Sequence, residues 1–114
     1  MFIEGGRLMI TFEEFKKLEI KVAKIKEVKD HPNTDKLYVI IIDLGDKTKQ
    51  IVAGIKSSYT KEALVGRQIV VVDNLEPAVL RGMESQAMLL AAQDDKGICL
   101  VVPDKEVKIG STIK

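Results

Sequence analysis

The sequence of 114 residues has the length of one globular domain. Hydrophobic residues make up 46% of it and charged residues 31%, which excludes a disordered tail and a membrane-spanning protein. Eighteen basic and seventeen acidic residues leave a net charge of +1, which excludes the uniformly basic surface of a general DNA-binding protein but permits a local basic patch.

The N-terminal segment lacks the pattern of a targeting signal. Residues 4–7 interrupt the apolar run that a secretory signal requires, and no stretch approaches the roughly 20 apolar residues of a membrane span. We therefore expect a cytoplasmic protein that does not enter membranes, with residues 1–9 as a leader and residues 10–114 as the domain.

The first predicted element is a short helix that begins at Thr11. Thr11 and Glu14 have the spacing of a capping box, in which each side chain accepts a hydrogen bond from the other residue's backbone N–H.

Beyond this helix the sequence pattern predicts short strands. The alternation of Leu18, Ile20 and Val22 shifts by one residue at Ile25, which predicts a β-bulge.

The remaining elements follow from turn residues and apolar runs. We expect strands from residue 18 to the loop at 30–35, then over 37–44, 50–55, 67–73, 86–92 and 98–102. One helical turn is expected over 60–65, and a long polar connection over 74–84. This order predicts an all-β OB-fold, a five-stranded Greek-key barrel with a short N-terminal helix, one helical turn between strands three and four, and a C-terminal extension.

The sequence offers no constellation for catalysis. His31 is the one histidine and precedes a proline, so we predict an ordinary loop residue there. Cys99 is the one cysteine and lies in an apolar run, so we predict a buried strand residue that makes no disulfide. With no metal-ligand cluster and no glycine-rich phosphate loop, we expect no enzymatic activity, cofactor or metal.

Basic residues gather in one part of the chain. Residues 16–36 contain seven lysines and four acidic residues, an excess of three positive charges. A solvated strand edge kept basic to prevent edge-to-edge pairing would explain this excess. A surface that contacts phosphates would explain it equally well, and Lys36, Lys56 and Arg81 at strand ends or in loops favour that second interpretation.

Aromatic residues are scarce, at 4% of the chain, and tryptophan is absent. Single-strand-binding OB domains stack bases on aromatic side chains, for which only Tyr38 and Tyr59 are candidates here. The composition therefore favours recognition of folded RNA through phosphates, 2′-hydroxyls and a few exposed bases.

Four segments carry a family resemblance. They are Asp30–Leu37 (DHPNTDKL), Ile51–Ile55 (IVAGI), Asn74–Pro77 (NLEP) and Gly82–Ala92 (GMESQAMLLAA). In this order the sequence from Ile10 onward resembles the tRNA-binding OB domain, which occurs at the C-terminus of many methionyl-tRNA synthetases and as a free-standing tRNA-binding protein.

The resemblance implies a homodimer, formed through the terminal segments, that binds the outer corner of L-shaped tRNA with little regard to tRNA identity. In archaea a separate chain of this size is usually labelled the β subunit of methionyl-tRNA synthetase, which implies the catalytic subunit as a further partner. The predicted tRNA-binding residues are Lys21 and Lys24 in the first strand, Asn33 and Lys36 in the loop, Lys56 after the strand over 50–55, Asn74 and Arg81 in the long connection, and Ser85 and Met88 in the last motif. All except Lys56 follow from the resemblance.

Some of these residues have alternative roles. Asn33 could close its loop as an Asx-turn, Asn74 could cap a strand end, and Met88 could belong to the core. Family members often carry basic residues where this chain has Glu76 and Val79, so weaker phosphate attraction is expected.

Two other functions also remain open at this stage. One is a chaperone-like dimer that binds unfolded peptide in an apolar groove. The other is a docking subunit that uses the helix near Phe12 and Phe15 and has little RNA affinity of its own.

Overall fold

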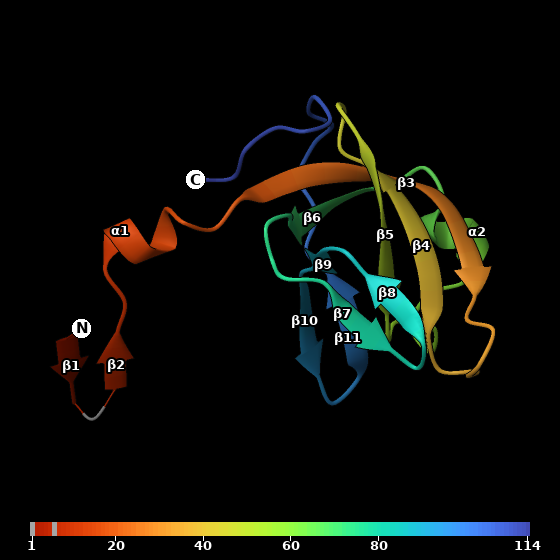
Figure 1. Cartoon of the computed structure of the whole chain (residues 1–114), viewed down its shortest axis with the longest axis horizontal. Helices are drawn as coiled ribbons and strands as arrows, with labels where there is room; N and C mark the ends of the chain where they lie inside the picture. Colours follow the sequence, from red (N-terminus) through yellow and green to blue (C-terminus); the bar gives the residue numbers. More distant parts are fainter. Residues whose placement is uncertain (1, 6) are drawn as a thin grey trace.

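The computed structural model describes residues 2–5 and 7–114 of the chain. Its centre is a five-stranded antiparallel sheet in the order β5–β4–β3–β6–β9, which curls into a barrel (Figure 1). The strands of this sheet are β3 (Ile20–Asp30), β4 (Tyr38–Asp43), β5 (Thr48–Ala53), β6 (Gln68–Val72) and β9 (Met88–Leu89).

The long strand β3 connects the two sides of the barrel. Its first half pairs with β6 and its second half with β4, and the two sets of pairs meet at Lys24. The register with β4 shifts between Ile25 and Glu27, so the predicted bulge is present. A bulge increases strand twist and bend, which allows one strand to belong to both sides of a barrel.

The free edge of β5 is closed by the segment before β9. The Gln86 backbone N–H donates to the Gln50 carbonyl over 2.8 Å, and the Val52 N–H donates to Ser85 Oγ over 2.9 Å. Ser85 Oγ in turn donates to the Ala87 carbonyl over 3.0 Å. These bonds nearly close the barrel and confirm the predicted five-stranded OB-fold.

The barrel interior is filled by branched aliphatic side chains. Ile25, Ile40, Ile42, Ile51 and Ile69 are almost completely buried. They lie at alternating strand positions, as expected when only one face of each strand points inward.

The predicted helical turn is α2 (Lys61–Leu64), which contributes the fully buried Leu64 to the same core. The Thr60 hydroxyl caps α2 by accepting a hydrogen bond from the Ala63 N–H, and Gly66 follows with a φ of 89°. Gly66 thus allows the chain to leave the helix in a left-handed conformation.

The polar connection predicted over 74–84 includes two short strands that the sequence analysis did not predict. It contains a hairpin of β7 (Ala78–Leu80) and β8 (Met83–Ser85), in which Leu80 is paired with Met83. Arg81 and Gly82 form the two-residue turn, and both have positive φ values, of 54° and 89°. This is the backbone geometry that suits tight hairpins, because it matches the twist of the strands.

The prediction that Cys99 is buried was wrong. β10 (Ala91–Asp94) and β11 (Gly97–Leu100) form a separate two-stranded sheet in which Cys99 is paired with Ala92. Both side chains are exposed, whereas the neighbouring Leu100 is buried. In a hairpin with one covered face, an apolar run has every second residue in solvent.

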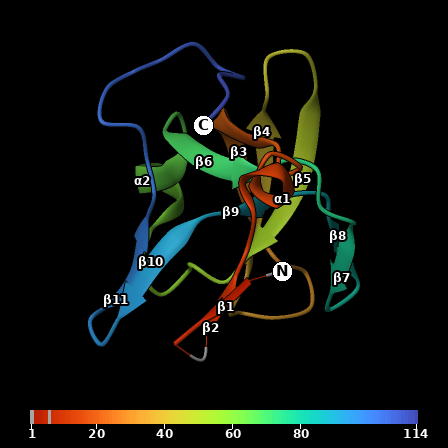
Figure 2. The same cartoon turned by 90° about the vertical axis from the view of Figure 1, so that its left-hand side faces the viewer.

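The two ends of the chain differ in how they contact the barrel. At the N-terminus, β1 (Phe2–Glu4) and β2 (Arg7–Met9) form a small hairpin, followed by α1 (Phe12–Phe15). This N-terminal arm extends to one side of the barrel in Figure 1 and points toward the viewer, in front of the barrel, in Figure 2. The predicted capping box is present, with Glu14 N–H donating to Thr11 Oγ1 over 3.1 Å.

The C-terminal extension lies along the start of β3. The Val22 N–H donates to the Ser111 carbonyl over 2.9 Å, and the Ile113 N–H donates to the Ile20 carbonyl over 2.8 Å. This pairing covers the part of β3 that extends beyond β4. In the part of the chain that the structure describes, no helix is long and apolar enough to cross a membrane.

Candidate nucleic-acid interface

One buried imidazole joins the β3–β4 loop to the tip of the β7–β8 hairpin. His31 Nε2 lies 2.9 Å from the Leu80 carbonyl, and the Asn33 N–H donates to His31 Nδ1 over 3.0 Å. Because a carbonyl only accepts, Nε2 carries the proton and Nδ1 is the acceptor. His31 is therefore in a loop, as predicted, but it is buried and both ring nitrogens are bonded.

Asn33 makes the second link to the hairpin. Its Nδ2 donates to the Arg81 carbonyl over 2.8 Å, and a Cβ on Gly82 would lie 3.4 Å from the same nitrogen. Arg81 is the one described non-glycine residue with a positive φ, a conformation that costs a side-chain-bearing residue about 1–3 kcal/mol. The loop thus holds the Arg81 backbone in place while its side chain is exposed.

Further cations lie near this junction. Lys36 is exposed in the same loop as Asn33. Lys56 Nζ lies 3.0 Å from Asp30 Oδ1 and 5.8 Å from the centre of the Tyr38 ring. Lys61 Nζ lies 2.9 Å from Asp30 Oδ2, so two lysines share one carboxylate. Hydrogen bonds from Lys61, then from Lys56, lower the pKa of Asp30, and the trio carries one positive charge in excess.

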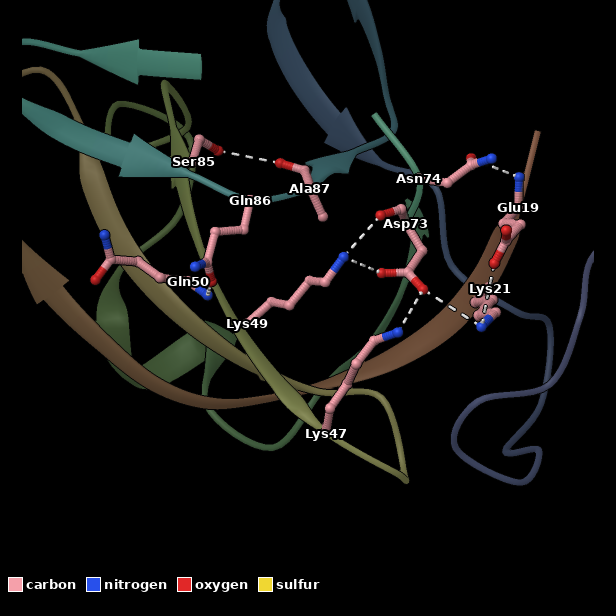
Figure 3. A network of polar contacts seen from close by, with 10 residues as sticks. All are labelled: Glu19, Lys21, Lys47, Lys49, Gln50, Asp73, Asn74, Ser85, Gln86 and Ala87. Atoms are coloured by element: carbon pink, nitrogen blue, oxygen red, sulfur yellow. Dashed lines mark hydrogen bonds and ion pairs between the residues drawn. The ribbon is translucent and has the colours of Figure 1, made fainter. Parts of the chain in front are cut away.

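A second group of lysines surrounds the buried carboxylate of Asp73 (Figure 3). Lys49 Nζ lies 2.7 Å from Oδ1, and the Lys21 and Lys47 ammonium groups lie 3.3 and 3.2 Å from Oδ2. Lys49 also donates to the Asp73 carbonyl over 2.8 Å. We call these four residues the Asp73 cluster.

Alternation along the strands places the Asp73 cluster at one end of the barrel interior. Lys49 has the inward parity of Ile51, and Lys21 has that of Ala23, both of which are buried core residues. Burial alone would raise the pKa of Asp73, but hydrogen bonds from the three lysines outweigh it and lower the pKa. Sequence reasoning named only Lys21 of these lysines.

Lys21 and Lys24 do not lie on the same face of β3. The bulge follows Ile25, so the register between the two lysines is regular. Residues three apart in a regular strand point to opposite faces. Lys21 accordingly belongs to the Asp73 cluster, whereas Lys24 is exposed on the outside of the barrel.

Asn74 anchors the segment that leads from α1 into β3. Its Nδ2 donates to the Lys17 carbonyl over 2.7 Å, and its Oδ1 accepts from the Glu19 N–H over 2.8 Å. Figure 3 shows the bond to Glu19 beside the Asp73 cluster. The side-chain amide of Asn74 therefore connects two backbone segments.

Ser85 and Met88 both line an apolar groove of about 490 Å³ between β5, the β7–β8 hairpin and β10. Ser85 is buried, and its hydroxyl makes the two bonds that help to close the barrel. Met88 is 49% exposed as a residue and so does not belong to the core. The structure thus brings Asn33 and Arg81 together at the hairpin tip, with Lys36 exposed in the loop that carries Asn33 and Met88 in the adjoining groove.

Among the residues that the structure describes, no group of three or more His, Cys, Asp or Glu side chains could hold a metal ion. Tyr38 is buried and its hydroxyl donates to the Tyr59 carbonyl over 2.8 Å. The Tyr59 hydroxyl accepts from the Leu100 N–H over 3.0 Å. Both tyrosines therefore have structural contacts inside the domain.

Comparisons with known proteins match nearly the whole chain. Residues 20–112 match a family profile described as "Putative tRNA binding domain". The methionine–tRNA ligase of Thermococcus onnurineus (strain NA1) is 53% identical over 112 residues, which cover 97% of this chain and 15% of the ligase. The chain thus spans about 15% of the length of such curated relatives.

Two solved structures have the same fold. The MetRS related protein from Pyrococcus horikoshii has a TM-score of 0.87 and 32% identity, with 95% of this chain and 100% of that chain covered. The CsaA chaperone protein from Picrophilus torridus has a TM-score of 0.86 and 33% identity, with 93% and 100% covered.

Proposed function

This chain belongs to the tRNA-binding domain family, and we propose that it binds the outer corner of folded tRNA and presents the tRNA to a methionyl-tRNA synthetase. Binding is largely indifferent to tRNA identity. Residues 10–114 form the binding domain, which acts in the cytoplasm and has no catalytic role of its own.

The observation that carries this proposal is the fixed Arg81 turn beside the β3–β4 loop. Its guanidinium is exposed at the hairpin tip, while hydrogen bonds from His31 and Asn33 hold the backbone carbonyls of Leu80 and Arg81. A planar guanidinium pairs with phosphate through two parallel hydrogen bonds. Because the backbone is fixed beforehand, little conformational freedom is lost on binding.

The remaining predicted residues take three kinds of role in this proposal. Lys24, Lys36 and Lys56 supply positive charge near the phosphate backbone, which positions the RNA without reading its sequence. Met88 offers an apolar contact. Lys21, Asn74 and Ser85 act through the protein itself, because their polar groups already bond to neighbouring residues.

The functional unit of the proposal is a homodimer formed through the terminal segments. Leu8, Ile10 and Phe12 on the N-terminal arm are each more than 60% exposed. Val101 and Val102 add exposed apolar surface near the C-terminus. Apolar exposure of this kind marks an interaction surface. Sedimentation at micromolar concentration should give twice the monomer mass, and a single species at the monomer mass would refute the dimer.

Binding to mixed total tRNA tests the proposal, with duplex RNA and single-stranded DNA as comparison ligands at two salt concentrations. We expect a preference for tRNA that weakens steeply as salt rises, because phosphate contacts release counterions. Equal binding of all three nucleic acids, or no binding, would refute it.

The same assay addresses the chaperone alternative, which the apolar groove and the similarity to CsaA favour. Binding of an unfolded apolar polypeptide should be nearly independent of salt. If such binding were found without tRNA binding, the chaperone function would replace the proposed one. Binding of a synthetase without either ligand would favour the docking role of α1.

A further inference from the structure

The groove beside Met88 has a lining that suits a base better than a phosphate. Most of it is apolar, including Leu75, Leu80, Met88 and Leu90, and its volume of about 490 Å³ is within the usual range for small-ligand sites. One charged residue, Glu76, lines the groove, and its carboxylate would repel a phosphate. An apolar trough with one carboxylate fits a flat, uncharged ring that carries N–H donors.

Cations lie in the chain next to this lining rather than in it. Arg81 directly follows the lining residue Leu80, and Lys56 directly follows Ile55. A Cβ added to Gly54, another lining residue, would lie 3.5 Å from Cδ2 of Leu37, the residue after Lys36. The groove is therefore continuous with the proposed phosphate-binding residues.

We infer that this groove accepts one unstacked nucleobase from the outer corner of the tRNA, while Arg81 and its neighbours hold the flanking phosphates. The inference rests on the proposed function and specifies which part of the ligand the groove contacts. The chain has few aromatic residues on which a base could stack, and the apolar side chains of the groove provide a stacking surface instead. Met88 suits this role because its flexible thioether adapts to a flat ring.

Glu76 gives the groove a chemical preference. A carboxylate accepts hydrogen bonds from base amino and imino groups, and guanine presents two such donors side by side. The preferred base is thus one with N–H donors on its exposed edge. Glu76 therefore weakens the attraction of phosphates at this position but accepts hydrogen bonds from the base.

The test uses the full chain and tRNA transcripts in which single nucleotides in the loops of the outer corner are made abasic. Removing the base that enters the groove should weaken binding about 5- to 150-fold, which corresponds to stacking energies of about 1–3 kcal/mol per base. In Met88→Ala the same abasic change should lower the affinity for the tRNA by less than about threefold. Val79→Ala, which truncates an exposed side chain outside the lining, should retain the full abasic effect.

Two results would overturn the inference and leave the proposed function intact. One is that every abasic tRNA binds the native chain within about twofold of intact tRNA, while Arg81→Ala still weakens binding. The other is an abasic effect of equal size in Met88→Ala, which would reflect altered tRNA folding. Binding of an apolar polypeptide that depends on Met88, without any abasic effect, would assign the groove to a protein ligand. Failure to bind any tRNA would instead remove the proposed function together with this inference.

Discussion

Replacing Asp73 with asparagine removes the charge that holds three lysines at the end of the barrel. In the native protein the carboxylate is 2% exposed and has three ammonium nitrogens within 3.3 Å. The variant keeps the size of the side chain but leaves Lys47 and Lys49 without this counter-charge, and Lys21 with only Glu19 Oε1, 3.7 Å from its Nζ. Since the asparagine carbonyl can accept only some of their hydrogen bonds, the variant should be less stable.

The magnitude follows from the burial of the partners. Removing one partner of a buried ion pair costs about 3–5 kcal/mol. Lys21 and Lys49 are 23% exposed and Lys47 is 42% exposed, so water can partly solvate the orphaned ammonium groups. We therefore expect a loss of about 2–4 kcal/mol in the free energy of unfolding. With an unfolding entropy of roughly 2.1 cal/mol/K per residue, a loss of about 3 kcal/mol lowers the Tm by about 12 °C.

Urea unfolding of Asp73→Asn at neutral pH measures this loss, with Asp46→Asn as the matched control because Asp46 is exposed on the same turn as Lys47. The control should change stability by less than about 0.5 kcal/mol. An equally small change in Asp73→Asn would refute the claim that the carboxylate stabilises the barrel.

Acid provides an independent check on the same residue. The pKa of Asp73 is lowered in the folded state from its ordinary value of 3.8. Its contribution is therefore complete above that value and is lost as the pH falls through the lower, folded-state pKa. The stability difference between the native chain and Asp73→Asn should be constant from about pH 5 to 7 and should shrink below pH 3.8. A difference that instead disappeared as the pH rose would contradict the assignment.

Three further predictions concern the hairpin and the barrel closure. Arg81→Ala should weaken tRNA binding about 5- to 20-fold and reduce the slope of log affinity against log salt by about one, with an unchanged Tm; an unchanged slope would show that Arg81 does not contact phosphate. His31→Ala should weaken tRNA binding several-fold and speed hydrogen exchange at the Asn33 amide, because that N–H loses its acceptor; unchanged exchange would refute the link between loop and hairpin. Ser85→Ala should lower the free energy of unfolding by about 2–3 kcal/mol, because the buried Val52 N–H loses its partner, and a loss below about 0.5 kcal/mol would show that the closure does not depend on this hydroxyl.

The barrel could be predicted because most of its strands carry a local signal. β3 to β6 are five to eleven residues long, which is enough for alternation and turn residues to mark them. The β7–β8 hairpin was missed because each strand has only three residues, too few to show a period of two. The Arg81–Gly82 pair was the available signal, since glycine in a two-residue turn marks tight hairpins.

The site could be predicted only in part. Motif positions located Asn33 and Arg81, but their contact joins residues 48 apart in the chain, which no local pattern shows. The Asp73 cluster was missed although the sequence carried a signal for it. Lys47 and Lys49 occupy every second position before the inward-facing Ile51, which places both lysines on the inward face. The family resemblance named both Lys21 and Lys24 as tRNA-binding residues, but the register between them is regular, so they lie on opposite faces of β3.

Ribose and phosphate footprinting of a folded tRNA bound to the full chain tests the central claim most directly. We predict protection of the two loops that meet at the outer corner, with the anticodon and the acceptor end left reactive, and the same pattern on tRNAs of different identity. Protection centred on the anticodon or the acceptor end, or protection that is unchanged when the tRNA is unfolded, would contradict recognition of the folded corner.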